Sequence, residues 1–331
     1  MIKKLQNSFR LIQRYRHYLT TTPEPPLGPT RVWLEPTSHC NFKCPLCPNP
    51  YLPRETQGYM ELDFYRDILN QLKPSIYDLN LFHRGESLMH PDILEMVEIA
   101  KQMDIYVRLH TNASLLTKDM SENLIRSGLD FISFSFDGFE KETYEKNRLN
   151  GKFEKTLDNV IGFLKTKQDL GSDTPYSVLQ AIDYFPEDQI NKITQQKFLE
   201  QFKGLPLDRS VIRQAHNWAG LVDIETNGNR PLEPIPCTFL WYSLTICWDG
   251  KVSPCPQDFF EELIVGDLKK ESLDQIWNGP KMVGLRKRFK NRDIDFHPCK
   301  TCDRIWRPTV LGIPVDYVSA FVKDNLFAYN D

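Results

Sequence analysis

The chain has 331 residues, of which 40% are hydrophobic and 12% aromatic, enough to fill the core of one large domain and a smaller one. Its 41 basic and 44 acidic residues give a formal net charge of −3, which offers no global positive field to attract nucleic acid or an anionic membrane. No stretch has the apolar length of a membrane span or of a secretion signal, so we expect a cytoplasmic protein with reduced thiols.

Residues 1–29 form the first predicted segment. Apolar and basic side chains follow a helical pattern up to about residue 19, and several prolines then fall between residues 20 and 29. The pattern predicts a basic amphipathic helix followed by an extended linker. Such a helix can lie on a membrane surface or on an anionic partner, but we expect it to pack on its own protein.

Strand and helix patterns alternate from residue 30 to about residue 215. Six strand–helix repeats with right-handed crossovers predict an α/β fold, a partial (β/α)6 parallel barrel with its functional residues at the C-terminal strand ends. We expect strands at 31–35, 77–82, 105–110, 131–136, 177–182 and 210–213. We expect helices at 62–72, 93–102, 118–127, 153–167 and 189–202.

A tight group of thiols, Cys40, Cys44 and Cys47, follows the first predicted strand. Three thiolates in one loop can hold three irons of a cubane cluster and leave the fourth iron open to a small molecule, whereas ferredoxin-type motifs close every iron with sulfur. The alternative is a zinc knuckle, which needs a fourth nitrogen or sulfur donor. His39 is the local candidate, but it adjoins Cys40 and gives poor chelate geometry.

This C-x3-C-x2-C spacing after a first strand resembles the motif of the radical S-adenosylmethionine (SAM) superfamily. The resemblance implies a 4Fe–4S cluster whose open iron binds the amino and carboxylate groups of SAM. One electron, supplied by a flavodoxin- or ferredoxin-type donor, then cleaves SAM to a 5'-deoxyadenosyl radical that abstracts hydrogen from a substrate C–H bond.

Other loops of the barrel also resemble family motifs. His83-Arg84-Gly85-Glu86-Ser87 stands where the family usually has Gly-Gly-Glu-Pro, with Arg84 and Ser87 as departures, and Thr111-Asn112-Ala113 is similar to the family's Thr-Asn-Gly. The Ser-x-Asp-Gly segment and a following arginine contact SAM in related enzymes. The resemblance thus implies a set of SAM-contacting residues: Glu86, Asn112, Ser135, Asp137 and Arg148. Gln180, on the fifth predicted strand, is a further candidate for contact with the adenine of SAM or with the substrate.

Residues 216–331 are expected to form a second domain with its own metal site. Cys237, Cys255, Cys299 and Cys302 provide four thiols, and an Asp-Gly turn at residues 249–250 predicts a hairpin between the first two. Spacing alone fits zinc or a cluster. In context, the segment resembles the SPASM/twitch extension of radical SAM enzymes, and four thiols imply one auxiliary 4Fe–4S cluster without an open iron.

Cys247 remains outside both thiol groups. It is a candidate catalytic hydrogen donor of the kind used by radical epimerases, although a cysteine between Ile246 and Trp248 also fits a plain core position. Weaker candidates for a substrate pocket are Arg213, His216, Asn217 and Asp258.

Three functions remain open from the sequence. The cysteine spacing is similar to that of a twitch-type cyclitol dehydrogenase, which favours oxidation of a small polyol or aminosugar with the auxiliary cluster as electron acceptor. A ribosomal-peptide maturase that oxidises, crosslinks or epimerises its substrate is the second possibility. A non-enzymatic zinc-binding regulatory module is the third. The substrate is accordingly expected to be a small molecule or a peptide.

Overall fold

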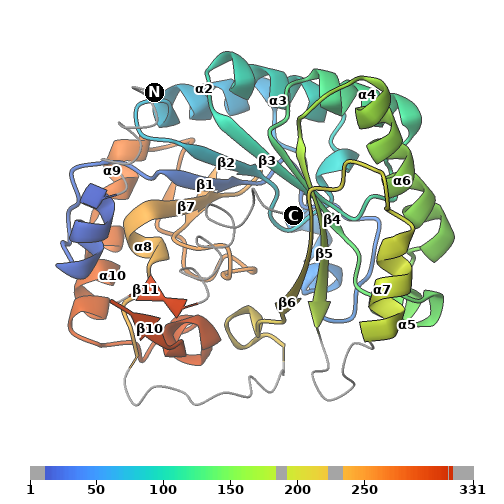
Figure 1. The fold of residues 1–331 in the computed structure, drawn as a ribbon. Helices are drawn as coiled ribbons and strands as arrows, with labels where there is room; N and C mark the ends of the chain where they lie inside the picture. The colour runs from blue at the N-terminus through green and yellow to red at the C-terminus, as the bar shows by residue number, and fades with distance from the viewer. Residues whose placement is uncertain (1–11, 184–191, 223–233, 312, 316–331) are drawn as a thin grey trace.

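The computed structural model describes residues 12–183, 192–222, 234–311 and 313–315. Within these residues a nine-stranded sheet, in the order β6-β5-β4-β3-β2-β1-β7-β8-β9, curls into the partial barrel seen in Figure 1. In chain order its strands are β1 (Arg31–Leu34), β2 (Asp78–Leu81), β3 (Tyr106–Thr111), β4 (Phe131–Ser135), β5 (Tyr176–Asp183), β6 (Arg209–Gln214), β7 (Ser243–Ile246), β8 (Lys251–Ser253) and β9 (Gly266–Asp267).

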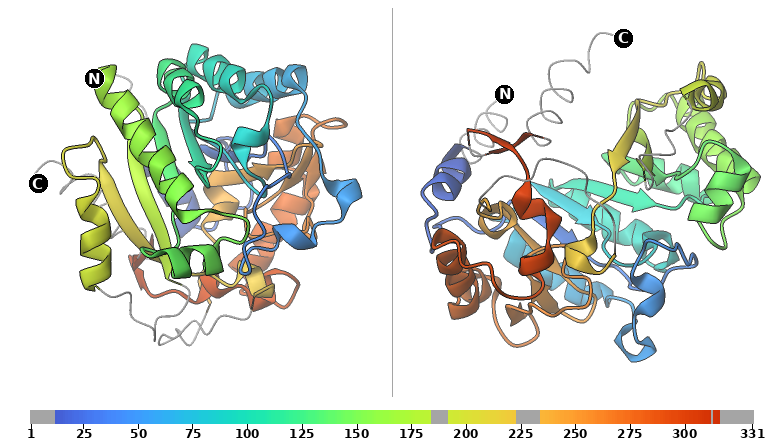
Figure 2. Two further views of the ribbon diagram at one scale, coloured as in Figure 1. Left: turned by 90° about the vertical axis from the view of Figure 1, so that its right-hand side faces the viewer. Right: turned by 90° about the horizontal axis from the view of Figure 1, so that it is seen from below.

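Helices cover the outer face of this sheet, and Figure 2 shows them in a row from the side. Those of the barrel are α2 (Leu62–Leu72), α3 (Ile93–Gln102), α4 (Lys118–Arg126), α5 (Lys141–Asn147), α6 (Phe153–Asp169) and α7 (Lys192–Glu200). The partial barrel predicted from the sequence is therefore confirmed. The predicted helix at 189–202 is observed from residue 192 to residue 200, and its first residues lie outside the described part.

The two-faced character of the strands explains where the core lies. In α2, Tyr65, Ile68, Leu69 and Leu72 repeat at helical spacing and are fully buried against the sheet. In β3, Val107 and Leu109 are fully buried, whereas the alternate residues are half-buried. Since side chains alternate across a strand, the polar alternate residues line the inner face of the barrel. The core thus lies between sheet and helices.

The C-terminal region continues the barrel sheet. Strand β7 pairs in parallel with β1, with Arg31 opposite Ser243 and Leu34 opposite Ile246, and β8 and β9 then add in antiparallel order. The predicted Asp-Gly hairpin joins β7 to β8. Strands from both sides of the boundary expected near residue 215 therefore belong to one continuous sheet. Short helices α8 (Phe239–Tyr242), α9 (Leu273–Trp277) and α10 (Pro280–Lys290) and a separate β10–β11 pair (Thr309–Val310, Ile313–Pro314) complete this region.

Residues 12–19 are helical and lie beside α9 and α10 (Figure 1). The guanidinium of Arg14 donates to the carbonyl of Trp241 at 3.2 Å, and the ring of Trp241 donates to the carbonyl of Thr22 at 2.8 Å. Trp277 donates in the same way to Leu27. The N-terminal segment thus packs on the C-terminal half of its own chain. Residues 1–11 of the predicted helix and the tail from residue 316 lie outside the described part.

No helix among the described residues is both long enough and apolar enough to cross a membrane.

Candidate functional site

The first cysteine group occupies the loop that follows β1. Cys44 is buried, Cys40 and Cys47 are half-buried, and the amide of Cys47 closes a turn on the carbonyl of Cys44 at 3.1 Å. Burial, with Glu86 and the neighbouring thiols adding to it, raises the pKa of Cys40 to about 12. Burial likewise raises the pKa of Cys47 to about 11. Thiols with such raised pKa values ionise readily only when a metal takes the charge.

Arg148 and Asp137, two of the predicted contact residues, meet beside this loop. They form an ion pair at 2.6 Å, and the Nη1 atom of Arg148 lies 3.8 Å from the Sγ atom of Cys44. The second oxygen of Asp137 accepts the backbone N–H of Ile182 at 2.9 Å. The carboxylate of Asp137 is therefore fixed by the protein and orients the Arg148 guanidinium toward the cysteine loop.

Glu86 lies on the loop after β2, and the residue is 3% exposed. Its Oε1 accepts the hydroxyl of Thr111 at 2.7 Å, and its Oε2 accepts the backbone N–H of Asn112 at 2.7 Å. Burial raises the pKa of Glu86, while these donors and Arg148 oppose the rise. Each carboxylate oxygen can accept further bonds, so Glu86 is held in place and can still take a ligand donor.

Gly85 cannot be replaced without moving the main chain. A Cβ atom at this position would lie 2.3 Å from the carbonyl oxygen of Thr37 and 2.5 Å from that of His39. The backbone N–H of Glu86 donates to His39 at 2.8 Å. The glycine is thus required for the close approach of the Glu86 loop to the chain just before Cys40.

The turn after β3 is also attached to the cysteine loop. The side-chain amide of Asn112 donates to Asn41, within the cysteine motif, at 2.8 Å. Ala113 takes the left-handed φ of +61° at the place where the resembling motif has glycine. On the neighbouring strands, Ser135 is half-buried in register with Gln180, whose Oε1 accepts the Nε–H of Arg213 at 2.9 Å. The structure therefore brings Glu86, Asn112 and Arg148 to the cysteine loop and engages Gln180 with Arg213.

The second cysteine group comes from three separate segments. Cys237 precedes α8, Cys255 follows β8, Cys299 is the first residue of the short helix η6 (Cys299–Thr301), and Cys302 directly follows that helix. Burial raises the pKa of Cys237 to about 12 and that of Cys255 well above its usual range, and the other thiols of the group add to the rise at Cys255. The fold therefore brings the four thiols close to one another, with Cys302 buried and the other three half-buried.

Residues 217–218 bridge the two cysteine groups. The side chain of Asn217 donates to the carbonyl of Thr301, between Cys299 and Cys302, at 2.7 Å. The ring of Trp218 donates to the carbonyl of Leu46, beside Cys47, at 3.2 Å. Trp218 thus lies at the interface between the barrel and the C-terminal region. Of the weaker candidates, His216 packs on the Trp218 ring, and Asp258 bonds within its own loop to Ser253 and two backbone amides.

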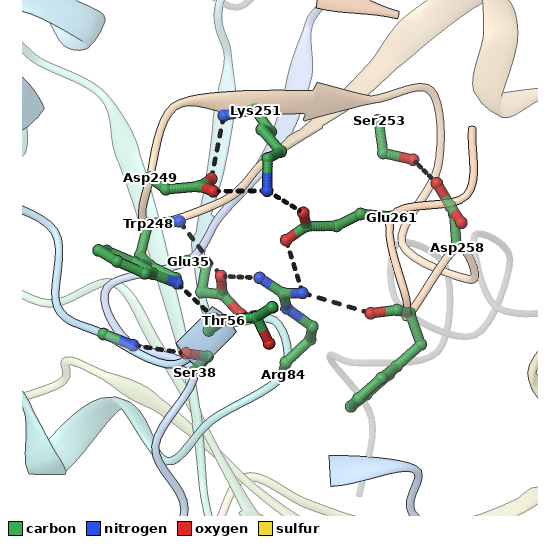
Figure 3. Close-up of polar contacts among 12 residues, drawn as sticks. Glu35, Ser38, Thr56, Arg84, Trp248, Asp249, Lys251, Ser253, Asp258 and Glu261 are labelled. Atoms are coloured by element: carbon green, nitrogen blue, oxygen red, sulfur yellow. Dashed lines mark hydrogen bonds and ion pairs between the residues drawn. The ribbon is translucent and has the colours of Figure 1, made fainter. Parts of the chain in front are cut away.

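Cys247 lies in the β7–β8 turn with an exposure of 1%. Its pKa is raised well above the usual range by burial and by the nearby carboxylates of Glu35 and Glu261, while Arg84 opposes the rise. The structure thus places this thiol beside a buried ionic network that Figure 3 shows in close-up. It belongs to neither thiol group.

The sequence interpretation missed this network. Arg84 was noted only as a departure from glycine, yet its guanidinium bonds both carboxylate oxygens of Glu35 at 2.7 Å and pairs with Glu261 at 2.7 Å. The one feature of the sequence that could have pointed to Glu35 is its position at the end of the first predicted strand. Thr111 as a partner of Glu86 and Asn41 as a partner of Asn112 were also missed.

The two thiol groups fit iron–sulfur clusters by their donor chemistry. A four-iron cluster takes one thiolate per iron, so its ligands need not converge on a point. In the described part of the chain, no three His, Cys, Asp or Glu side chains converge in the way that a single metal ion requires. Two buried polar atoms of the barrel, Nε2 of His83 in the loop after β2 and Oγ of Ser133 in the middle of β4, have no protein partner among the described residues. Such atoms fit a site that a polar molecule completes.

Comparisons with known proteins agree with this geometry. Residues 34–176 match the family model of the Radical SAM superfamily, and residues 237–303 match the SPASM iron–sulfur cluster-binding domain. The PqqA peptide cyclase of Granulibacter bethesdensis is 24% identical over 315 residues, covering 86% of this chain and 81% of the relative.

Solved structures share the fold. SuiB of Streptococcus suis bound to the precursor peptide SuiA has a TM-score of 0.64 at 16% identity and covers 92% of this chain and 75% of its own. BtrN in complex with AdoMet and 2-DOIA has a TM-score of 0.54 at 17% identity and covers 83% of this chain and 93% of its own.

Both matched families are iron–sulfur families, and this favours clusters over zinc at the two thiol groups. The cofactors are a 4Fe–4S cluster with SAM in the barrel and an auxiliary iron–sulfur cluster in the C-terminal region. The chain is therefore an enzyme of the radical SAM superfamily that carries a C-terminal SPASM domain.

Proposed function

We propose that this enzyme modifies a peptide substrate, acting as a ribosomal-peptide maturase that oxidises, crosslinks or epimerises it. The observation that carries the proposal is the alignment with PqqA peptide cyclases across 86% of this chain and 81% and 84% of the two relatives. The likeness of fold to SuiB bound to a precursor peptide supports it. Peptide modification, the second possibility from the sequence, thus replaces oxidation of a small polyol as the preferred function.

The proposal assigns the thiols to two clusters. Cys40, Cys44 and Cys47 hold the cluster that binds SAM, and Cys237, Cys255, Cys299 and Cys302 hold the auxiliary one. The proximity of the thiols within each group supports ligation, because Cys44 and Cys47 lie close enough to Cys40, and Cys237, Cys299 and Cys302 to Cys255, to act on it electrostatically. When bound, the first cluster and SAM supply a 5'-deoxyadenosyl radical, and the second cluster supplies a one-electron acceptor.

The protein groups around the first cluster bind and orient SAM. Arg148, fixed by Asp137, presents a guanidinium that suits the SAM carboxylate. Glu86, fixed by Thr111 and Asn112, presents a carboxylate that suits the SAM amino group. Ser135 and Gln180 lie in register on neighbouring strands, and we assign them to the nucleoside side of the site.

The proposal divides the chain into an N-terminal segment (1–29), a radical SAM barrel (30–215) and a SPASM region with its tail (216–331). It places the enzyme in the cytoplasm, where a flavodoxin- or ferredoxin-type protein supplies the electron. The packing of residues 12–29 on the C-terminal half supports a structural role for the N-terminal segment.

Oxidation of a small polyol or aminosugar remains the second candidate. It is favoured by one observation, that the C-terminal cysteine group has four thiols, enough for a single auxiliary cluster. The likeness of fold to BtrN in complex with AdoMet and 2-DOIA supports it as well.

Label transfer distinguishes the two candidates. The anaerobically reconstituted enzyme is incubated with SAM, reductant and either perdeuterated precursor peptides or perdeuterated cyclitols and aminosugars. The proposal predicts deuterium in 5'-deoxyadenosine with a peptide donor and none with the small molecules. Transfer from a cyclitol alone would replace the proposal with the second candidate.

A further inference from the structure

The strip Arg84-Gly85-Glu86 is fixed to the chain that leads into the first cysteine group. The side-chain amide of Asn49 donates to the carbonyls of Arg84 at 2.8 Å and of Ser38 at 2.9 Å. Gly85 and Glu86 make their close contacts with the same segment, as described above. The backbone of this strip is therefore held without help from the Arg84 side chain.

The Arg84 side chain points instead into the C-terminal region (Figure 3). Its Nε and Nη2 atoms donate to the two oxygens of Glu35 at 2.7 Å, and its Nη1 atom pairs with Glu261 at 2.7 Å and reaches the carbonyl of Phe259 at 3.4 Å. The side chains of Arg84, Glu35 and Glu261 are 1%, 0% and 9% exposed. Charges this deeply buried are retained only when each is paired and hydrogen-bonded.

Glu261 belongs to the loop between β8 and β9, the same loop that carries Cys255. Its backbone has a φ of +60°, which a non-glycine residue adopts only when its surroundings enforce it. Its second carboxylate oxygen pairs with Lys251 at 2.8 Å, and Lys251 also pairs with Asp249 at 2.8 Å. The loop is thus held in a strained conformation by ion pairs at both carboxylate oxygens of Glu261, one with Arg84 and one with Lys251.

The network also continues into the β7–β8 turn. The backbone N–H of Trp248 donates to Glu35 at 3.1 Å, so Glu35 joins the end of β1 to that turn as well as to Arg84. One buried guanidinium therefore links the strip that contains Glu86, the end of the first barrel strand and the loop that contains Cys255.

We propose that Arg84 is a positioning residue that fixes the auxiliary-cluster loop relative to the SAM-binding strip, so that the two iron–sulfur sites keep one separation and orientation. The inference rests on the proposed assignment of Cys255 as a ligand, and it goes beyond that assignment by naming what sets the arrangement of the two sites. Small displacements of reacting groups cost large factors in rate. The potential of a cluster follows the charge, hydrogen bonds and solvent exposure around it.

The test uses the reconstituted holoenzyme and three variants. Arg84→Met removes the anchor and keeps most of the side-chain volume. Glu261→Gln keeps the shape of one partner and removes its charge. Lys167→Met is the matched control, because Lys167 is also a buried cation, 2% exposed and paired with Asp208 at 2.9 Å, on the outer side of the barrel.

Three quantities are measured: iron content, the midpoint potential of the auxiliary cluster by redox titration, and the amount of product per 5'-deoxyadenosine. For Arg84→Met we expect continued 5'-deoxyadenosine formation, since the strip backbone is held by Asn49 and His39, but a loss of product per 5'-deoxyadenosine on the order of 10²-fold. For Glu261→Gln we expect a higher midpoint potential, because one buried negative charge beside the loop is gone. Lys167→Met should change neither the midpoint potential of the auxiliary cluster nor the amount of product per 5'-deoxyadenosine.

An Arg84→Met enzyme with full iron content, an unchanged potential and an unchanged product ratio would overturn the proposal. So would a Lys167→Met control that loses product per 5'-deoxyadenosine to the same extent as Arg84→Met, since the effect would then be general loosening. If the Arg84→Met variant does not fold, the Glu261→Gln variant provides the test. An unchanged midpoint potential of the auxiliary cluster in that variant would refute the proposal. The midpoint potential of the auxiliary cluster is measured without substrate. A wrong assignment of the peptide substrate would therefore leave this measurement valid, and the two failures can be told apart.

Discussion

Arg148 holds two partners at once: its Nη2 atom lies 2.6 Å from a carboxylate oxygen of Asp137, and its Nη1 atom lies 3.8 Å from the Sγ atom of Cys44. Asp137 is fully buried and Arg148 nearly so. A guanidinium oriented by one buried carboxylate presents its remaining donors in a fixed direction. We propose that the pair prepares a carboxylate-binding position beside the cysteine loop before SAM arrives.

Asp137→Asn should weaken SAM binding. The asparagine oxygen can still accept the N–H of Ile182, but the charge that fixes Arg148 is lost. We expect the Kd for SAM to rise about 10-fold, which corresponds to one charge-assisted hydrogen bond of about 1.5 kcal/mol. Equilibrium binding of SAM under anoxic conditions measures this. Glu154→Gln, which breaks an exposed ion pair with Lys141, is the control and should leave the Kd unchanged. Equal Kd values for Asp137→Asn and the control would contradict the assignment.

Cys44→Ala should remove one cluster and spare the other. With two four-iron clusters the wild-type enzyme should hold about eight irons, and the variant about four. Formation of 5'-deoxyadenosine should cease, because SAM loses its binding iron. Iron analysis and chromatography of the reaction mixture check both points. A variant that keeps about eight irons and still cleaves SAM would show that Cys44 is not a ligand.

Much of the fold followed from local pattern. The apolar residues of helices α2 and α3 repeat at helical spacing, and the sequence therefore predicts both helices with their observed ends, 62–72 and 93–102. The Asp-Gly turn likewise predicted the β7–β8 hairpin. The thiol groups were found because cysteine spacing in a reduced protein carries chemical meaning.

Long-range pairings could not be predicted in this way. Nothing local marks β7 as the neighbour of β1, since parallel pairing is set by tertiary packing between strands that are far apart in the chain. The same holds for Arg84, Glu35 and Glu261, which are single charges in three distant loops. Each is ordinary alone, and only the fold shows that they neutralise one another in the interior.

Acid should destabilise the protein through His110. Burial first, then Arg108 and Arg213, lower the pKa of His110 to about 3, while Asp78 opposes the shift. The unfolded chain, with a pKa near 6.5, binds this proton more readily, so stability falls as the pH drops from about 6.5 toward 3. Between pH 7 and pH 5.5 His110 should account for a loss of about 1 kcal/mol.

The variant His110→Phe isolates this contribution. A phenyl ring keeps the packing against Phe82 and Phe131, whose ring centres lie 4.7 and 5.8 Å from that of His110. Denaturation midpoints of wild type and variant, followed from pH 7 to pH 5.5, should therefore diverge, with the variant losing less. Parallel pH dependence of the two proteins would mean that His110 does not stay neutral in the folded state.

Cys247→Ala should leave catalysis intact. The thiol is 1% exposed and surrounded by the ionic network, so it has no open approach to a substrate. We expect unchanged product yield and a loss of about 1 kcal/mol in stability from the smaller side chain. Product analysis in deuterated solvent is the sharpest measurement, since a hydrogen-donating thiol would bring solvent deuterium into the product. Loss of both product and solvent label in the variant would restore Cys247 as a donor.

The most direct test of the account concerns the three thiols after β1. Cys299→Ala removes the auxiliary cluster and leaves the first one for observation by electron paramagnetic resonance in the reduced state. The account predicts a spectrum that changes when SAM is added, together with continued formation of 5'-deoxyadenosine. A spectrum that SAM does not alter, with no 5'-deoxyadenosine formed, would contradict the claim that Cys40, Cys44 and Cys47 hold a cluster with an iron open to SAM.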